Sequence, residues 1–125
     1  MCNGVKANIL NIASSSSLRP AISPYTLSKW GIKGLTLGLA KTLTRYGIVV
    51  NALAPGPTAT PMLLSQPIES IHLPESPATR FATAEEVANM AVILVSDMGR
   101  MIIGDCVYMT GGAGTITYDD IEYNF

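Results

Sequence analysis

Tyr25 and Lys29 lie four residues apart in a segment with the pattern of a helix, and a run of serines, Ser14 to Ser17, precedes them. On a helix this spacing places two side chains on the same face, one turn apart. An ammonium beside a phenol favours the phenolate and lowers the pKa of the phenol from its usual value of about 10. Such a phenol can exchange a proton with a carbonyl/alcohol pair. Because Tyr-x-x-x-Lys also arises by chance, its surroundings must decide its meaning.

The segments around this pair predict the elements that position it. A short apolar run at residues 7–13 is typical of a buried strand, and it ends at the serines. Ser23 suits the N-cap of a helix and Pro24 its first position. We expect this helix to cover residues 24–46, with Gly47 as its stop signal.

The rest of the chain predicts a further strand, a second helix and a third strand in that order. A buried strand is expected at residues 48–54, and a third short strand at 106–110. Thr83 and Glu86 form a capping box that begins a second helix, whose apolar residues recur with helical spacing. The proline-rich segment 55–78, between the strand at 48–54 and the second helix, is expected to be a long functional loop. The glycines at 111–114 are expected to form a turn at the end of a strand that needs no ligand.

These segments resemble the short-chain dehydrogenase/reductase family over about residues 5–114. The matching motifs follow one another in the order of that family. They are Asn11-Ile12-Ala13-Ser14-Ser15, Tyr25-Thr26-Leu27-Ser28-Lys29, Val50-Asn51-Ala52-Leu53-Ala54-Pro55-Gly56 with Thr60, Arg80 to Ala88, Leu94-Val95-Ser96-Asp97, and Ile103-Gly104-Asp105 leading to Gly111-Gly112.

The resemblance implies hydride transfer between a nicotinamide, NAD or NADP, and a carbonyl or secondary alcohol. It gives Tyr25 the role of proton donor and acceptor, and Lys29 that of activating the phenol and binding the nicotinamide ribose. Ser14 would hydrogen-bond the substrate oxygen as a preorganised donor. The backbone at Pro55-Gly56 and the Thr60 hydroxyl would hold the nicotinamide carboxamide.

The site serine has an alternative. Many members of the family place it thirteen residues before the tyrosine, where this chain has Ile12. Ser14 matches by its position at the end of a strand, which implies a loop shorter by two residues, and Ser15 is the other candidate. Lys33 and Lys41, on the same helix, are expected to be solvated.

The part of the family domain that binds the cofactor pyrophosphate has no counterpart here. No glycine-rich turn lies between a strand and a helix, and the family's Asn-Asn-Ala-Gly segment and upstream catalytic Asn are missing. We therefore expect residues 1–125 to be the C-terminal half of a doubly wound, Rossmann-like parallel sheet, with three strands and two main helices. We expect this chain alone not to bind NAD or NADP tightly.

Composition excludes several other classes of protein. The formal net charge is −1, which indicates neither a nucleic-acid partner nor a membrane surface. No signal peptide is visible, and Cys2 and Cys106 have no metal-ligand spacing, so we expect no metal and a reducing, cytoplasmic location. His72 is expected to be an exposed loop residue. A serine hydrolase is disfavoured because no Gly-x-Ser-x-Gly elbow occurs.

The first helix carries a signal for self-association. Gly31, Gly34 and Gly38 each weaken a helix by roughly 1 kcal/mol relative to Ala, and close approach of another backbone would offset that cost. Mean hydropathy is +0.33 and only 14% of the residues are charged, so apolar surface is expected to be covered, either by the missing half of the domain or by another subunit. We expect a homodimer or homotetramer through helix 24–46, although small residues packing on the sheet would explain the glycines equally well.

Two functions remain open after these observations. The first is an NAD(P)-dependent oxidoreductase of which this chain is one part. The second is a non-catalytic half-domain remnant that acts as an oligomerising or scaffold protein.

Overall fold

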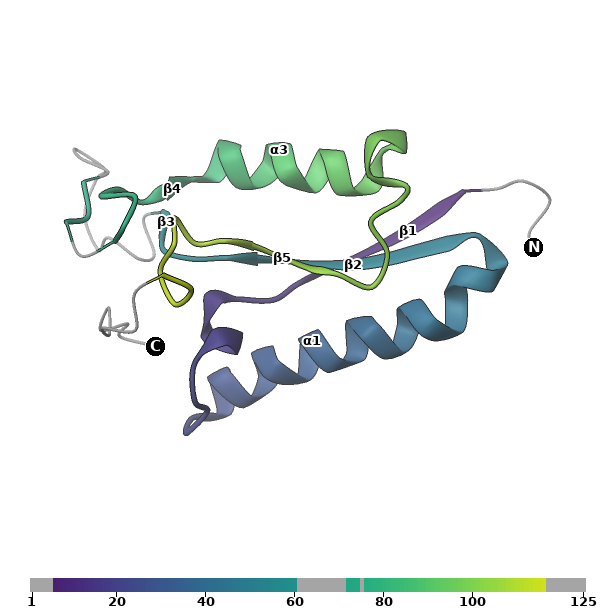
Figure 1. The fold of residues 1–125 in the computed structure, drawn as a ribbon, viewed down its shortest axis with the longest axis horizontal. Coiled ribbons are helices and arrows are strands. Elements are labelled where there is room, and N and C mark those ends of the chain that lie inside the picture. The colour runs from purple at the N-terminus through teal and green to yellow at the C-terminus, as the bar shows by residue number, and fades with distance from the viewer. Residues whose placement is uncertain (1–5, 61–71, 75, 117–125) are drawn as a thin grey trace.

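The computed structural model describes residues 6–60, 72–74 and 76–116, which form three layers (Figure 1). A parallel sheet lies in the middle, with strand order β1–β2–β5. Helix α1 lies on one face of this sheet and helix α3 on the other. The bounds are β1 Ala7–Ile12, α1 Pro24–Leu43, β2 Ile48–Pro55, α3 Ala84–Val95 and β5 Cys106–Met109. The parallel α/β sheet with two main helices that the sequence predicts is thus confirmed.

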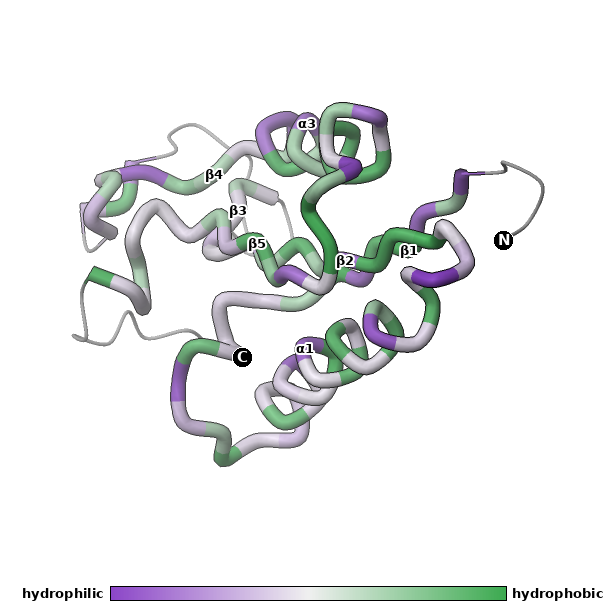
Figure 2. Tube along the Cα trace, turned by 45° about the vertical axis from the view of Figure 1, so that its right-hand side comes forward, coloured by the Kyte–Doolittle hydropathy of each residue, from purple (hydrophilic) through white to green (hydrophobic). Residues whose placement is uncertain are grey.

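Strand β2 is central and is buried along most of its length because it has a strand on each edge and a helix over each face. It pairs in parallel with β1, in a register that sets Ala7 opposite Ile48, and with β5, where Ala52 lies opposite Cys106. Apolar residues concentrate along β1, β2 and the connection from α3 to β5 (Figure 2). A strand covered on both faces needs this continuous apolar pattern rather than alternation.

Helix α1 begins and ends at the predicted signals. The Ser23 hydroxyl accepts a hydrogen bond from the Thr26 amide, and Pro24 occupies the first turn. The α-helix ends at Leu43 and continues as a 3₁₀ turn, Thr44–Tyr46, which stops at Gly47 with φ of +76°. That left-handed conformation favours glycine because it has no Cβ.

The core lies where α1 crosses the ends of β1 and β2. Ala13, Ala52 and Ala54 are buried together, and Ile32 of α1 packs against them. Small residues let the helix approach the sheet closely. Because side chains alternate along a strand, Asn51 and Leu53 face the opposite side, towards α3.

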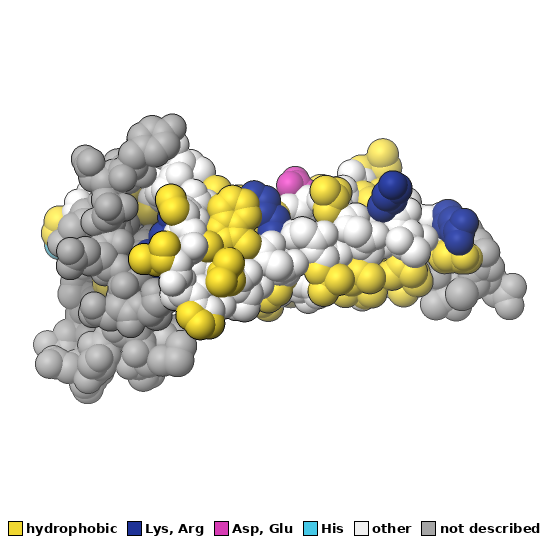
Figure 3. Space-filling model, turned by 90° about the horizontal axis from the view of Figure 1, so that it is seen from below, with side chains coloured by type: hydrophobic (Ala, Val, Ile, Leu, Met, Phe, Trp, Pro, Cys, Tyr) yellow, Lys and Arg dark blue, Asp and Glu magenta, His cyan; other side chains and the backbone are white. Residues whose placement is uncertain are grey.

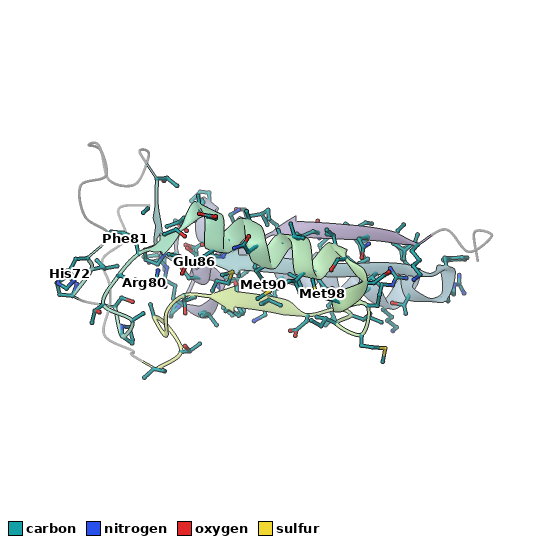
Figure 4. All side chains as sticks on the ribbon, turned by 90° about the horizontal axis from the view of Figure 1, so that it is seen from above. His72, Arg80, Phe81, Glu86, Met90 and Met98 are labelled. Carbon is teal, nitrogen blue, oxygen red and sulfur yellow. The ribbon has the colours of Figure 1, made fainter. Side chains whose placement is uncertain are left out.

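Helix α3 has the predicted capping box, in which Thr83 and Glu86 bond each other's backbone amides. Arg80 adds a bidentate ion pair with Glu86, and both lie at the start of α3 (Figure 4). A two-stranded parallel sheet, β3 (Thr58–Ala59) with β4 (Ala82–Thr83), joins this point to the segment that follows β2.

The expected loop at 55–78 is described only in part, since residues 61–71 and 75 lie outside the described residues. Its first part contains β3, which was not predicted because two residues are too short to show a periodic pattern. Residues 111–116 form turns, as expected. Within the described part of the chain, no helix combines the length and the apolar character needed to cross a bilayer.

Candidate active site

The predicted site residues converge at the edge formed by the carboxyl ends of the strands. β1 and β2 run in parallel, and the Ala13 amide donates to the Leu53 carbonyl at 2.8 Å just beyond the last residue of β1. Ser14 follows β1, and Gly56 follows β2. Ligands of open parallel α/β sheets bind outside this edge.

Tyr25 and Lys29 lie in the first two turns of α1, above the end of β1. The Lys29 Nζ lies 5.6 Å from the centre of the Tyr25 ring. The same Nζ donates a hydrogen bond of 3.2 Å to the carbonyl of Ile12, the last residue of β1. The Tyr25 side chain keeps access to solvent, since 39% of the residue is exposed. A single ammonium thus links the phenol, the helix and the strand end.

Ser14 is buried and acts as the N-cap of a 3₁₀ turn over Ser15–Leu18. Its Oγ accepts from the Ser16 amide at 3.1 Å and donates to the Ser16 Oγ at 3.1 Å. The Ser15 hydroxyl makes no hydrogen bond to any residue that the structure describes, although Ser15 is equally buried. The Ser14 hydroxyl is therefore fixed by hydrogen bonds to Ser16, whereas the Ser15 hydroxyl makes none within the part of the chain that the structure describes.

The segment after β2 is fixed by close packing against β5. The Gly56 amide donates to the Met109 carbonyl at 2.9 Å, and the Gly56 carbonyl accepts from the Thr58 hydroxyl at 3.0 Å. A Cβ at position 56 would lie 2.8 Å from the Thr110 Cα, so only glycine fits. Both backbone polar atoms of Gly56 are thus already used within the chain. Thr60 is half-buried at the end of this segment.

Lys33, which the sequence suggested to be solvated, is half-buried. Its Nζ lies 5.3 Å from the centre of the Trp30 ring and 5.4 Å from that of the Tyr108 ring. The contact with Tyr108 was not predicted because Tyr108 belongs to β5, more than seventy residues away in the sequence, and only the fold brings it to α1. Lys41, in contrast, is exposed as expected.

The described residues fit one end of a nicotinamide dinucleotide and not the other. Lys29 keeps ammonium protons beyond the one given to Ile12, and Tyr25 reaches solvent, so both can meet a ribose and a substrate oxygen. A pyrophosphate needs free amides at a helix N-terminus. The first turn of α1 is capped by Ser23 and begins with Pro24, and that of α3 carries the Glu86 carboxylate.

The described part of the chain holds no group of three or more His, Cys, Asp or Glu side chains able to bind a metal ion. His72 is exposed, as expected, and forms an isolated antiparallel bridge with Arg80. Figure 4 shows its side chain at the end of the molecule beyond the start of α3.

Asn51 is a structural residue that the sequence analysis treated only as part of a motif. It is fully buried, and its amide nitrogen donates to the Ile102 carbonyl at 2.6 Å. Its amide oxygen accepts from the Asp105 amide at 3.0 Å. The signal was available, since an asparagine inside an apolar strand must find partners for all its polar atoms.

Comparison with known proteins places this arrangement in a family. A family model described as enoyl-(acyl carrier protein) reductase matches residues 1–114. The chain is 38% identical over 117 residues to glucose 1-dehydrogenase 2 of Bacillus subtilis, covering 90% of this chain and 45% of the relative. It is 34% identical over 113 residues to gluconate 5-dehydrogenase of Gluconobacter oxydans, covering 86% and 44%.

Solved structures agree with these relatives. Gluconate 5-dehydrogenase from Burkholderia cenocepacia, in complex with NADP and tartrate, aligns with a TM-score of 0.73 at 33% identity, over 86% of this chain and 44% of that one. Acetoin dehydrogenase from Enterobacter cloacae aligns with a TM-score of 0.77 at 29% identity, over 92% and 46%.

The chain therefore belongs to the short-chain dehydrogenase/reductase family, a class of oxidoreductases with a Rossmann-type fold. It spans about half the length of the curated relatives that it matches, since it covers 44% of one and 45% of another.

Proposed function

We propose that this chain supplies the Ser–Tyr–Lys part of an NAD(P)-dependent oxidoreductase that interconverts a carbonyl and a secondary alcohol of a small molecule. The observation that carries the proposal is Lys29, whose ammonium lies beside the Tyr25 ring and holds the Ile12 carbonyl, two residues before Ser14. This contact brings a phenol, an ammonium and a serine loop to the ligand-binding edge of the sheet.

The roles of the three residues follow from their chemistry. The nicotinamide, when bound, gives or accepts the hydride. Tyr25 gives a proton to the carbonyl oxygen, or takes it from the alcohol. Lys29 stabilises the phenolate that remains and holds the ribose. The Ser14 hydroxyl orients the substrate oxygen by a hydrogen bond, for which its proton turns from the Ser16 Oγ to the substrate. Pro55, Gly56 and Thr60 line the nicotinamide end.

The residues proposed above account for the nicotinamide end of NAD or NADP and not for its pyrophosphate end. We propose that residues 1–125 form the C-terminal half of the domain, and that the 125-residue chain alone binds neither cofactor tightly. Both helix N-termini in the described part are already capped, which supports this view. Titration with NADH and NADPH by calorimetry tests it, and micromolar binding to a chain of verified mass would contradict it. A cytoplasmic location remains a prediction.

The catalytic assignment is tested with the natural polypeptide that contains residues 1–125. Oxidation or reduction of a panel of ketones and secondary alcohols is followed by NAD(P)H absorbance. Tyr25→Phe should lower turnover by at least about 10²-fold, the usual loss of a general acid/base. Lys29→Met should lower turnover and weaken cofactor binding. Tyr46→Phe, an exposed tyrosine beyond the far end of α1, is the matched control. Full activity of Tyr25→Phe would refute the assignment.

A second candidate function is a non-catalytic half-domain that acts by oligomerising. The exposed apolar side chains of α1, Leu27, Leu35 and Leu37 among them, favour a homodimer or homotetramer through this helix. Intact-mass spectrometry separates the two functions. A mass near 13.2 kDa together with no activity would favour the half-domain, and a mass near twice that value would favour an intact oxidoreductase.

A further inference from the structure

Two aromatic side chains anchor the serine loop, which we define as residues Ser14–Arg19. Tyr108 of β5 shares a hydrogen bond of 2.6 Å with the Ser17 hydroxyl. Trp30 of α1 donates its indole N–H to the Arg19 carbonyl at 2.9 Å. One anchor fixes the loop to the sheet, and the other fixes its end to the helix.

Lys33 connects the two anchors. Its ammonium lies within 5.3 Å of the Trp30 ring centre and 5.4 Å of the Tyr108 ring centre. A cation at this distance is attracted to an aromatic face. Its side chain also lines a hollow of about 240 Å³ together with Tyr108 and Cys106. A single charge is therefore attracted to both rings.

Hydrogen bonds inside the loop lead from these anchors to Ser14. The Ser17 hydroxyl donates to the Ser14 carbonyl at 2.9 Å. Because a hydroxyl has one proton, the Tyr108 phenol must be the donor in its bond to Ser17. The Ser14 hydroxyl is itself held by Ser16, whose Oγ also accepts from Arg19 at 3.2 Å.

We propose that Trp30, Lys33 and Tyr108 form a clamp that positions the Ser14 hydroxyl for the substrate, so that all three are positioning residues. This inference rests on the proposed function, in which Ser14 orients the substrate oxygen. A group that orients a substrate must be held within a fraction of an ångström by its supporting residues. The clamp supplies that support by tying the loop to β5 at Ser17 and to α1 at Arg19.

The first test needs no activity. Trp30 is the single tryptophan of the chain, so its indole N–H gives one signal in a ¹⁵N NMR spectrum. Tyr108→Phe keeps the ring over Lys33 and removes only the bond to Ser17. We expect this variant to shift the Trp30 indole signal and to speed its exchange with water severalfold, because the loop end at Arg19 loosens.

Tyr46→Phe is the matched control and should leave the indole signal in place. Lys33→Met keeps the aliphatic stem, removes the charge that joins the rings, and should act in the same direction as Tyr108→Phe. If Tyr108→Phe does not fold, Lys33→Met decides the outcome alone. An indole signal unchanged in both variants would overturn the clamp.

The second test is a double-mutant cycle in the active polypeptide. Tyr108→Phe should lower kcat roughly 10-fold, as expected for a misplaced catalytic group, and leave the KM for NAD(P) unchanged. In a Ser14→Ala background the same change should cost nothing further, because Tyr108 acts through Ser14. Losses that multiply in the double variant would show that Tyr108 acts elsewhere, and would overturn the proposal.

The two tests separate this inference from the proposed function. Full activity of Ser14→Ala would remove Ser14 from the site and with it the catalytic meaning of the clamp, while Tyr25→Phe still decides whether the phenol is the acid/base. An inactive polypeptide would refute the proposed function, and the indole signal would then decide whether the clamp holds the loop.

Discussion

At the scale of single residues, side chains that share a sequence motif do different work. Lys29 reaches the Ile12 carbonyl at the end of β1 and the Tyr25 ring. Asn51, in the next motif along the chain, faces the other way and ties β2 to the backbone that leads into β5. A motif therefore identifies the family, and contacts are needed to separate chemistry from support.

Asn51→Ala should destabilise the fold strongly. The substitution leaves the Ile102 carbonyl and the Asp105 amide without partners in a buried place, and we expect a loss of about 2–4 kcal/mol in the free energy of unfolding. Urea unfolding followed by circular dichroism measures it. Asn89→Ala, at an exposed position of α3, should change the stability by less than about 0.5 kcal/mol. Equal stability of the two variants would contradict this role of Asn51.

Cys106 should react slowly with thiol reagents in the folded chain. Burial raises the pKa of its thiol above the usual value of 9.0, and the nearby Lys33 charge offsets this only in part. Because the thiolate is the reacting form, reaction with a disulfide reagent at pH 8 should be slower than in the unfolded chain. The experiment uses Cys2→Ser so that one thiol is followed. Equal rates in the folded and unfolded chain would contradict the prediction.

At the scale of elements, the sequence predicted where α3 begins, but it did not predict the ion pair that stabilises this beginning. The spacing of three residues between Thr83 and Glu86 predicts the capping box. Arg80 joins Glu86 through a bidentate pair because the β3–β4 contact fixes the preceding segment. The Arg80 hydrogen bond, followed by the Thr83 amide, lowers the pKa of Glu86 from 4.5 to about 2.

This lowered pKa predicts how stability depends on pH. Because the folded-state pKa of Glu86 is below its unfolded value, its contribution is complete above pH 4.5 and is lost as the pH falls towards about 2. The melting temperature of the wild type should therefore drop more than that of Glu86→Gln between pH 5 and pH 2. Salt should reduce the difference, since both side chains are well exposed.

Glu85→Gln provides the control for this pH experiment. It removes the same charge one residue away in the first turn of α3, outside the pair with Arg80. Its melting temperature should follow the wild type down the pH range. Parallel curves for the wild type and Glu86→Gln would show that the pair does not stabilise the start of α3.

At the scale of the whole molecule, the outer face of α1 is one apolar surface that the described chain leaves uncovered. Hydrophobic side chains spread along this side of the molecule, with a few Lys and Arg side chains among them (Figure 3). Leu37 is 63% exposed, and a Cβ added at Gly31, Gly34 or Gly38 would meet no atom within 4 Å. Packing on the sheet within the described chain therefore does not explain the glycines, and association through α1 stays a prediction.

Gly34→Leu separates stability from assembly. The new side chain has room in a single chain and should stabilise α1 by about 0.5–1 kcal/mol, because glycine is a poor helix former. In a dimer packed through α1 it would block the approach of the two backbones. We expect a shift from dimer to monomer in sedimentation velocity, with a melting temperature that does not fall at the lowest concentrations.

Asn89→Leu adds the same side chain to the exposed face of α3 and should leave the assembly unchanged. A Gly34→Leu variant that remains a dimer would place the interface elsewhere. A wild-type chain that stays monomeric at high concentration would contradict association through α1 altogether.

The local sequence by itself determined the main helices and strands and their order. Ser23, Pro24 and Gly47 set the limits of the first helix, and largely apolar runs marked the strands of the main sheet, because capping and burial patterns act over a few residues. The spacing of Tyr25 and Lys29 determined that they share one face of α1. The resemblance to the family, together with the position of the serines after a strand, left Ser14 and Ser15 as the two candidates for the site serine.

Tertiary structure alone decided which distant groups meet. The Lys29 contact with Ile12 joins α1 to the strand that precedes it. The contacts of Tyr108 with Ser17 and with Lys33 join β5 to segments more than seventy residues away in the sequence. Such contacts depend on strand order and register, because a register shift of one residue turns every side chain of a strand to the other face of the sheet. No local pattern of residues carries that information. The sequence therefore identified the chemical groups, and the packing of β1, β2, β5 and α1 determined how they are held.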